Sequence, residues 1–150
     1  MAKLFLIAKN IIMLISEKLF GLPELQLLRS EKKDGELHLW GRSSLKTGLC
    51  PESMEQSSKI LERRERVVRD LPVLGMRVYL HLESRKFSRP SGGCFWEQFS
   101  FIRSKSRMTS RYEEYLYDSC RGADIHYVAS REGLGDDTVS QIFHLHAKKN

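Results

Sequence analysis

The stretch from Ile125 to His144 constrains the fold more than any other part of this 150-residue chain. Ala129 supplies a small side chain where two helices would approach closely, and Gly133, four residues later, suits a left-handed turn between them. Val139 and Ile142 then lie three residues apart, on one face of a second helix. This spacing predicts a helix-turn-helix. The residues predicted to form its core are Val128, Ala129, Leu134, Val139 and Ile142.

The solvent face of the second predicted helix carries polar side chains that can reach base edges in a major groove. These candidate readers are Thr138, Ser140, Gln141 and His144. Asp136 or Asp137 is expected to cap the start of this helix. Two acids at that end would repel phosphate, so an ordinary pair of core helices remains the alternative interpretation.

A further helix is predicted just before this pair. Thr109 or Ser110 can cap its start, and Glu113 suits the N-terminal end of its dipole. Tyr112, Tyr115 and Leu116 form its apolar stripe, and Arg121-Gly122 ends it. Residues 109–149 are therefore expected to form a three-helix unit.

The preceding part of the chain predicts β structure. From Met76 to Glu83, apolar and polar residues alternate strictly, which is the clearest strand signal in the sequence. Asp34-Gly35 is a hairpin signal between two shorter strands. The shorter predicted strands are 25–29, 36–40 and 67–71, and the polar run 54–66 is expected to be a loop or a helical turn. The aromatic residues Phe95, Trp96, Phe99 and Phe101 are expected in the core or between domains.

The positive charge of the chain is concentrated in one region. The formal net charge is +6, and the span from Lys59 to Arg89 contains nine basic and four acidic residues, giving +5. Such a block is typical of a phosphate-binding surface, although a solvated charged face is the alternative. The candidate phosphate contacts in this block and in the basic segment after it are Arg63, Arg64, Arg66, Arg69, Arg103, Lys105 and Arg107.

The start of the chain is apolar but interrupted by charged residues. Its longest uninterrupted apolar run is Ile11 to Ile15, far short of the roughly 20 residues that a membrane span needs. An amphipathic helix is expected here, with a helix at Leu14 to Phe20, or else a non-native extension before a start at Met13. The three cysteines form no secretory framework, which favours a reducing, cytoplasmic environment without a membrane partner.

Two of the cysteines lie in loops that flank the β segment. A structural zinc site uses four ligands, commonly two Cys-x-x-Cys knuckles. Here Cys50 is followed by Ser53 instead of a second cysteine, and no cysteine near Arg89 accompanies Cys94. Cys50 and Cys94 are therefore candidate metal ligands of a degenerate site. We expect no cofactor, with zinc doubtful.

As a set, these segments resemble the N-terminal half of bacterial insertion-sequence transposases of the ISL-three family. The resemblance runs from about Met13 to Lys149 and is carried by the order of its elements. The matching segments are LCPE, RRERVVRDLPVLGMRVYLHLESRKF, SRYEEYL and DIHYVASREGLGDDTVSQIFHLHAKK. The resemblance implies a zinc ribbon and a helix-turn-helix that bind terminal inverted repeats. In the family, an RNase H-like domain follows, with three acidic residues that use two divalent metals.

The sequence departs from that pattern at two points. Ser53 and Arg89 stand where the family's ribbon has cysteines, and the chain ends at Asn150 before a catalytic domain. We therefore expect an α+β chain and a DNA-binding transposase fragment without strand-transfer activity. The expected regions are an N-terminal helix or extension (1–22), a degenerate zinc-ribbon-like β domain (23–101) and a three-helix helix-turn-helix domain (102–150).

Other functions remain open at this stage. The expected partner is double-stranded DNA, but a non-functional remnant or a protein-interaction module without DNA binding is the alternative. A hydrolase that uses Cys94 or Cys120 with a histidine is disfavoured, because no histidine has a supporting local motif. The sequence fixes neither the DNA target nor the oligomeric state, and a homo-oligomer is compatible with it.

Overall fold

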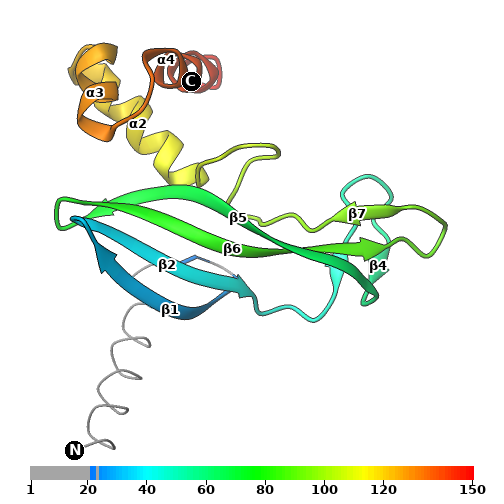
Figure 1. Ribbon diagram of the computed structural model, residues 1–150. Coiled ribbons are helices and arrows are strands. Elements are labelled where there is room, and N and C mark those ends of the chain that lie inside the picture. Colours follow the sequence, from blue (N-terminus) through cyan, green and yellow to red (C-terminus); the bar gives the residue numbers. More distant parts are fainter. Residues whose placement is uncertain (1–20, 23) are drawn as a thin grey trace, which may run out of the picture.

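The structure, a computed structural model, describes residues 21–22 and 24–150. The helix expected at 14–20 and the alternative start at Met13 lie outside these residues. The elements in chain order are β1 (Leu25–Lys33), β2 (Glu36–Ser43), β3 (Gly48–Leu49), β4 (Gln56–Ser57), β5 (Ile60–Val73), β6 (Met76–Ser88), β7 (Cys94–Trp96), α2 (Ser110–Gly122), α3 (Ile125–Glu132) and α4 (Asp136–Ala147). This order confirms the expected α+β class, with a β-rich part followed by three helices (Figure 1). Within the described residues, no helix is long and apolar enough to cross a membrane.

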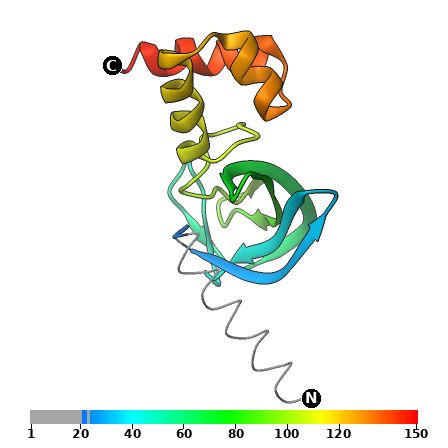
Figure 2. The ribbon, with the colours of Figure 1, turned by 90° about the vertical axis from the view of Figure 1, so that its left-hand side faces the viewer.

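β6 is the central strand of the larger sheet. It pairs antiparallel with β5 on one side and parallel with β2 on the other. β1 extends the sheet beyond β2, and β7 pairs antiparallel with the last residues of β6. The resulting strand order is β1-β2-β6-β5, while β3 and β4 form a separate two-stranded sheet. Seen from its end, the larger sheet is strongly curled (Figure 2).

Two-residue turns close both hairpins of the larger sheet. Asp34 and Gly35 have φ angles of 53° and 75°, which confirms the predicted hairpin between β1 and β2. Leu74 and Gly75, with φ angles of 50° and 77°, join β5 to β6. Both turns place two consecutive residues in the left-handed region, which matches the twist of the flanking strands.

The prediction of a loop or helical turn at residues 54–66 is wrong for most of these residues. β4 covers residues 56–57, and β5 already begins at Ile60. The residues from Leu61 to Glu65 are all exposed although they belong to a strand. Because this end of β5 has solvent on both faces, it needs no apolar alternation, and its polarity resembles that of a loop.

The apolar face of β6 forms the core of the sheet, as its alternation predicts. Val78, Leu80 and Leu82 are at most 1% exposed. Phe99 and Phe101, from the segment after β7, pack against this face and against each other. This confirms the core role expected for most of the aromatic run, and Phe95 is buried in a second cluster with Cys50 and Phe87.

Buried polar contacts fix the three-helix unit to the end of the sheet. Asp70 of β5 is fully buried, accepts a 2.7 Å hydrogen bond from the Thr109 hydroxyl and pairs with Arg111 at 2.5 Å. Thr109 is also the predicted N-cap of α2, since its side chain accepts from the Tyr112 amide. The start of α2 is therefore anchored to β5 by the same residue that caps the helix.

Candidate nucleic-acid interface

The turn between α3 and α4 is built around Gly133. Its φ is 66°, and its backbone N–H donates to the carbonyls of Ala129 and Ser130, which closes α3. A Cβ atom at this position would lie 2.6 Å from the guanidinium carbon of Arg77 on β6. The left-handed backbone favours glycine, as predicted for this turn, while the flexible tip of Arg77 could move aside.

The core of the helix-turn-helix is packed as its spacing predicts. Val128, Ala129 and Val139 are fully buried, and Ile142 is 7% exposed. Leu134 is partly buried against the same cluster. The alternating small and branched side chains therefore hold α3 and α4 together without any buried polar atom from these five positions.

The opposite face of α4 carries the candidate base readers. Thr138, Gln141 and His144 are exposed, and Ser140 is half-buried at the edge of the face. Both views place α4 at the periphery of the three-helix unit (Figures 1 and 2). The helix therefore presents a short polar face whose groups remain free to meet a partner.

The start of α4 differs from the prediction. Its N-cap is Gly135, without a side-chain capping bond, and Asp136 and Asp137 lie in the first helical turn. Carboxylates are favourable there because they interact with the positive end of the helix dipole. Asp136 also lies 3.0 Å from His126 of α3 and, through this hydrogen bond, raises the pKa of that imidazole. A protonated His126 offsets one of the two acids that would face phosphate.

A buried carboxylate ties α4 to the segment before α2. Glu113 is 1% exposed and accepts hydrogen bonds from Arg103 (3.1 Å), Ser106 (2.7 Å) and His146 (3.1 Å). Burial alone would raise the pKa of Glu113, but these hydrogen bonds outweigh burial and lower it. Sequence reasoning assigned Glu113 only to the helix N-terminus, because His146 is distant in the chain.

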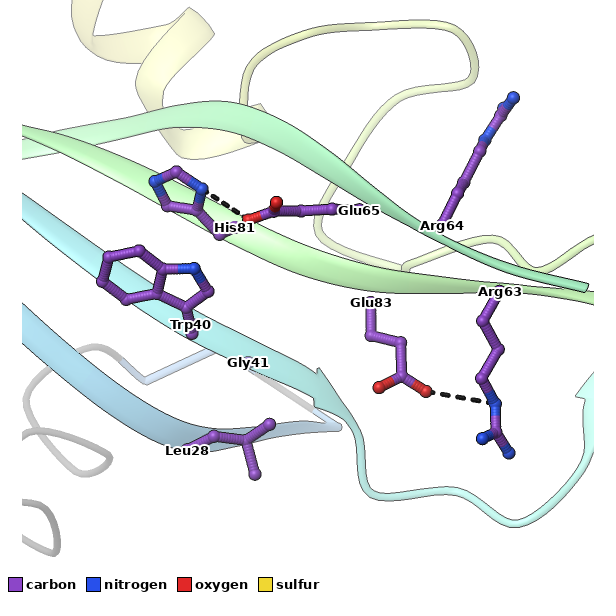
Figure 3. Close-up of a pocket in the computed structure, with 8 residues that line it drawn as sticks. All are labelled: Leu28, Trp40, Gly41, Arg63, Arg64, Glu65, His81 and Glu83. Carbon is purple, nitrogen blue, oxygen red and sulfur yellow. Dashed lines mark hydrogen bonds and ion pairs between the residues drawn. The ribbon is translucent and has the colours of Figure 1, made fainter.

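Three of the seven predicted phosphate contacts are paired with a glutamate or buried within the protein. Arg69 is 8% exposed and donates to the Tyr112 hydroxyl and the Glu132 carbonyl, each at 3.0 Å. It therefore helps to dock the helices and has little surface for phosphate. Arg103 pairs with Glu113, as above, and Arg63 pairs with a glutamate on the face of the sheet shown in Figure 3.

The other four predicted contacts come together in one groove of about 490 Å³. Its walls are β5, the end of β7 with the two residues that follow it, and the segment that precedes α2. The four basic residues are Arg64, Arg66, Lys105 and Arg107. Two basic segments that are about forty residues apart in the sequence thus form one surface, which we call the basic groove.

A second hollow, of about 340 Å³, lies on the other face of the sheet (Figure 3). Trp40 stacks on His81 with 4.4 Å between ring centroids. His81 contacts Glu65 at 2.7 Å, and Arg63 contacts Glu83 at 3.4 Å. Two glutamates, Glu65 and Glu83, balance the two arginines that line this hollow, Arg63 and Arg64, so it has no excess charge that would favour phosphate.

The two loops of the degenerate zinc site are joined by polar contacts. The Glu55 carboxylate accepts from the Ser53 hydroxyl (2.7 Å) and from the Ser91 amide (3.0 Å) and hydroxyl (2.8 Å). These hydrogen bonds lower the pKa of Glu55. Arg89 lies 3.7 Å from Glu52 and 4.0 Å from Glu55. We call this set of side chains the knuckle network.

The residues present do not fit a structural zinc ion. Cys50 is buried, whereas Cys94 is exposed, and none of the described residues form a group of three or more metal-ligating side chains. Ser53 and Arg89, where the resemblance implies cysteines, make polar contacts of the knuckle network. Hydrogen bonds from Ser53 lower the pKa of the Cys50 thiol to about 7, which favours the thiolate form that binds metals.

The fold defines a helix-turn-helix protein, a class in which the second helix commonly enters the major groove of DNA. Comparison with protein families gives two adjoining matches. Residues 97–147 match the helix-turn-helix domain of transposase family ISL3, and residues 46–88 match the zinc-finger of transposase IS204/IS1001/IS1096/IS1165. Both matched regions are thus similar to domains of ISL3-family transposases, and together they cover most of residues 46–147. No curated protein and no solved structure gave a significant match.

Proposed function

We propose that the chain binds duplex DNA through α4 and that its targets are the terminal inverted repeats of an insertion sequence. The observation that carries this proposal is the polar outer face of α4, opposite the fully buried Val139. Helices of this motif enter the major groove, where side-chain amides and hydroxyls distinguish base pairs. The match to a transposase helix-turn-helix supports the proposed kind of target.

Within the proposed complex, Gln141 is the principal base reader. Its amide is exposed and can pair bidentately with adenine. Thr138 and His144 lie three residues before and after it, on the same side of α4, and are expected to contact the neighbouring base pairs. Ser140, which is half-buried, contributes at the edge of this contact.

We further propose that these residues bind DNA without performing strand transfer. Two-metal strand transfer requires several carboxylates that converge on the ions. Across residues 21–22 and 24–150, the acidic side chains are instead committed to pairs with arginine, serine and histidine or stand apart. The proposed activity is thus recognition of element ends.

Selection from a pool of random duplexes tests this function. The purified chain should enrich one motif, and that motif should occur in the terminal inverted repeats of ISL3-family elements. Its affinity should exceed that for random duplex by at least about 10³, as is typical of specific DNA-binding proteins. Recovery of no motif, with equal affinity for all duplexes, would refute recognition and support a remnant or a protein-interaction module.

A further inference from the structure

The basic groove contains positive charge that the protein does not neutralise. Two acidic residues, Glu65 and Glu97, also line it. Glu65 is engaged by His81 at 2.7 Å, and Glu97 is held by Arg85 at 2.8 Å. In the described part of the chain, none of the four basic residues of the groove forms an ion pair. The groove therefore has more cationic side chains than carboxylates available to accept hydrogen bonds from them.

The arginines of the groove are held close together although they repel one another. Burial and the positive charge of Arg64 both lower the pKa of the Arg66 guanidinium. Arg66 also donates a hydrogen bond to the carbonyl of Ser106 on the opposite wall. An anion between the walls would relieve this repulsion, because it would interact favourably with several cations at once.

Arg64 is oriented so that its donors remain accessible. Its guanidinium stacks on the Trp96 ring, with its central carbon 3.9 Å from the ring centroid. Stacking uses the face of the guanidinium and leaves the N–H groups at its edge free for a phosphate. Figure 3 shows Arg63 and Arg64 extending from β5 in opposite directions, so alternation along the strand separates the paired arginine from the groove. Arg64 also covers Trp96, which disfavours stacking of an unpaired base there.

The wall that carries Lys105 and Arg107 is fixed relative to α4. The Arg69 amide donates to the Arg107 carbonyl at 3.0 Å, which holds this segment along β5. Ser106 donates to Glu113, and His146 of α4 contacts the same carboxylate. The groove and α4 therefore belong to one connected framework.

We propose that the basic groove binds the phosphodiester backbone of the same duplex whose bases α4 reads. The proposal rests on the DNA-binding function of α4 and adds a second, sequence-independent contact. Its chemistry is that of charge-assisted hydrogen bonds from guanidinium and ammonium groups to phosphate oxygens. The groove contributes affinity and α4 contributes sequence preference.

A double variant tests the proposal through the salt dependence of DNA binding. Arg64→Gln with Arg107→Gln removes two cations from the groove and leaves the ties of Arg66 and Ser106 intact. The slope of log affinity against log salt should become less steep by roughly two units. Affinity should fall by the same factor for the selected motif and for random duplex. Hydroxyl-radical footprints should lose backbone protection at one edge of the site.

The matched control is Arg42→Gln with Arg63→Gln, which removes two exposed arginines outside the groove. Arg42 contacts Gln26 and Arg63 contacts Glu83, so neither belongs to the groove. The control should keep the parent slope and footprint, and circular dichroism should show equal melting of both double variants. Equal slopes in the parent and the groove variant would overturn the proposal while the motif preference, and hence the function of α4, survives. The proposal would also be overturned if the groove variant lost affinity for single-stranded DNA but not for duplex DNA.

Discussion

The helix-turn-helix and the knuckle loops are stabilised by different kinds of contact. The helical pair is held by apolar packing around Val139, which is fully buried, and every predicted core position is occupied as the spacing requires. The knuckle loops contain two cysteines, Cys50 and Cys94, whereas a structural zinc site needs four ligands. Their loops are joined through Glu55, whose carboxylate accepts three hydrogen bonds.

This difference shows how two kinds of stabilisation tolerate substitution. A zinc site depends on a complete set of ligands, so the loss of two thiolates removes most of its affinity. An apolar core depends on volume and burial spread over many residues. The proposed recognition function therefore lies in the part of the chain whose stability does not depend on a cofactor.

The largest expected effect comes from breaking the core of the helical unit. Val139→Asp would place an unpaired charge in an apolar cluster and should lower the free energy of unfolding by roughly 4 kcal/mol or more. Urea unfolding followed by circular dichroism measures this change. Thr138→Asp is the matched control, since the neighbouring side chain is exposed. Equal unfolding midpoints for the two variants would contradict the described core.

Adding two cysteines to the knuckle loops should make their stability depend on a bound metal. In Ser53→Cys with Arg89→Cys, four cysteines occupy the two loops, and about one zinc per chain should bind. A chelator should then lower the melting temperature of the double variant and leave that of the parent unchanged, because metal binding couples to folding. Metal analysis and thermal melting provide the measurements. A parent chain that holds about one tightly bound zinc would contradict the knuckle network as its replacement.

These two regions also differ in how far the sequence predicts them. The helical spacing identified the core, the turn at Gly133 and the exposed face of α4, because these depend on local periodicity. It missed the Gly135 cap, since Asp136 instead pairs with His126. It could not show that Glu113 contacts His146, since that contact joins residues far apart in the chain.

The basic residues illustrate the same limit. Composition predicted a cationic surface, but alternation along β5 and docking of the helices decide which cations reach it. Arg69 is buried against Tyr112, whereas Arg64 lies in the groove. The exposed end of β5 was mistaken for a loop, because a strand with solvent on both faces lacks the apolar alternation that marks other strands. The knuckle network was unpredictable, because Ser91 meets Glu55 only through the fold.

A smaller effect is expected within the knuckle network itself. Glu55→Gln should increase hydrogen exchange at the Ser91 amide, which donates to this carboxylate in the parent. Glu52→Gln is the control, because the Glu52 side chain is largely exposed and lies 3.7 Å from Arg89. The overall melting temperature should change little.

The same network predicts a pH dependence. The pKa of Glu55 is lowered in the fold, so its contribution is present at neutral pH. It should be lost as the pH falls below the ordinary carboxyl range, roughly pH 4, and through the lower folded-state pKa. Exchange at Ser91 that is equal in the parent and the Glu55 variant across this range would remove the structural role assigned to Glu55.

The most direct test of the account is DNA titration of Gln141→Ala. This substitution removes the exposed amide and leaves the buried face of α4 unchanged. The circular dichroism spectrum of the variant should therefore match that of the parent. Affinity for the selected motif should fall by about 1–3 kcal/mol, while affinity for random duplex should remain that of the parent. If the variant and the parent bind both duplexes with the same affinities, α4 does not read bases through Gln141, and the central claim is contradicted.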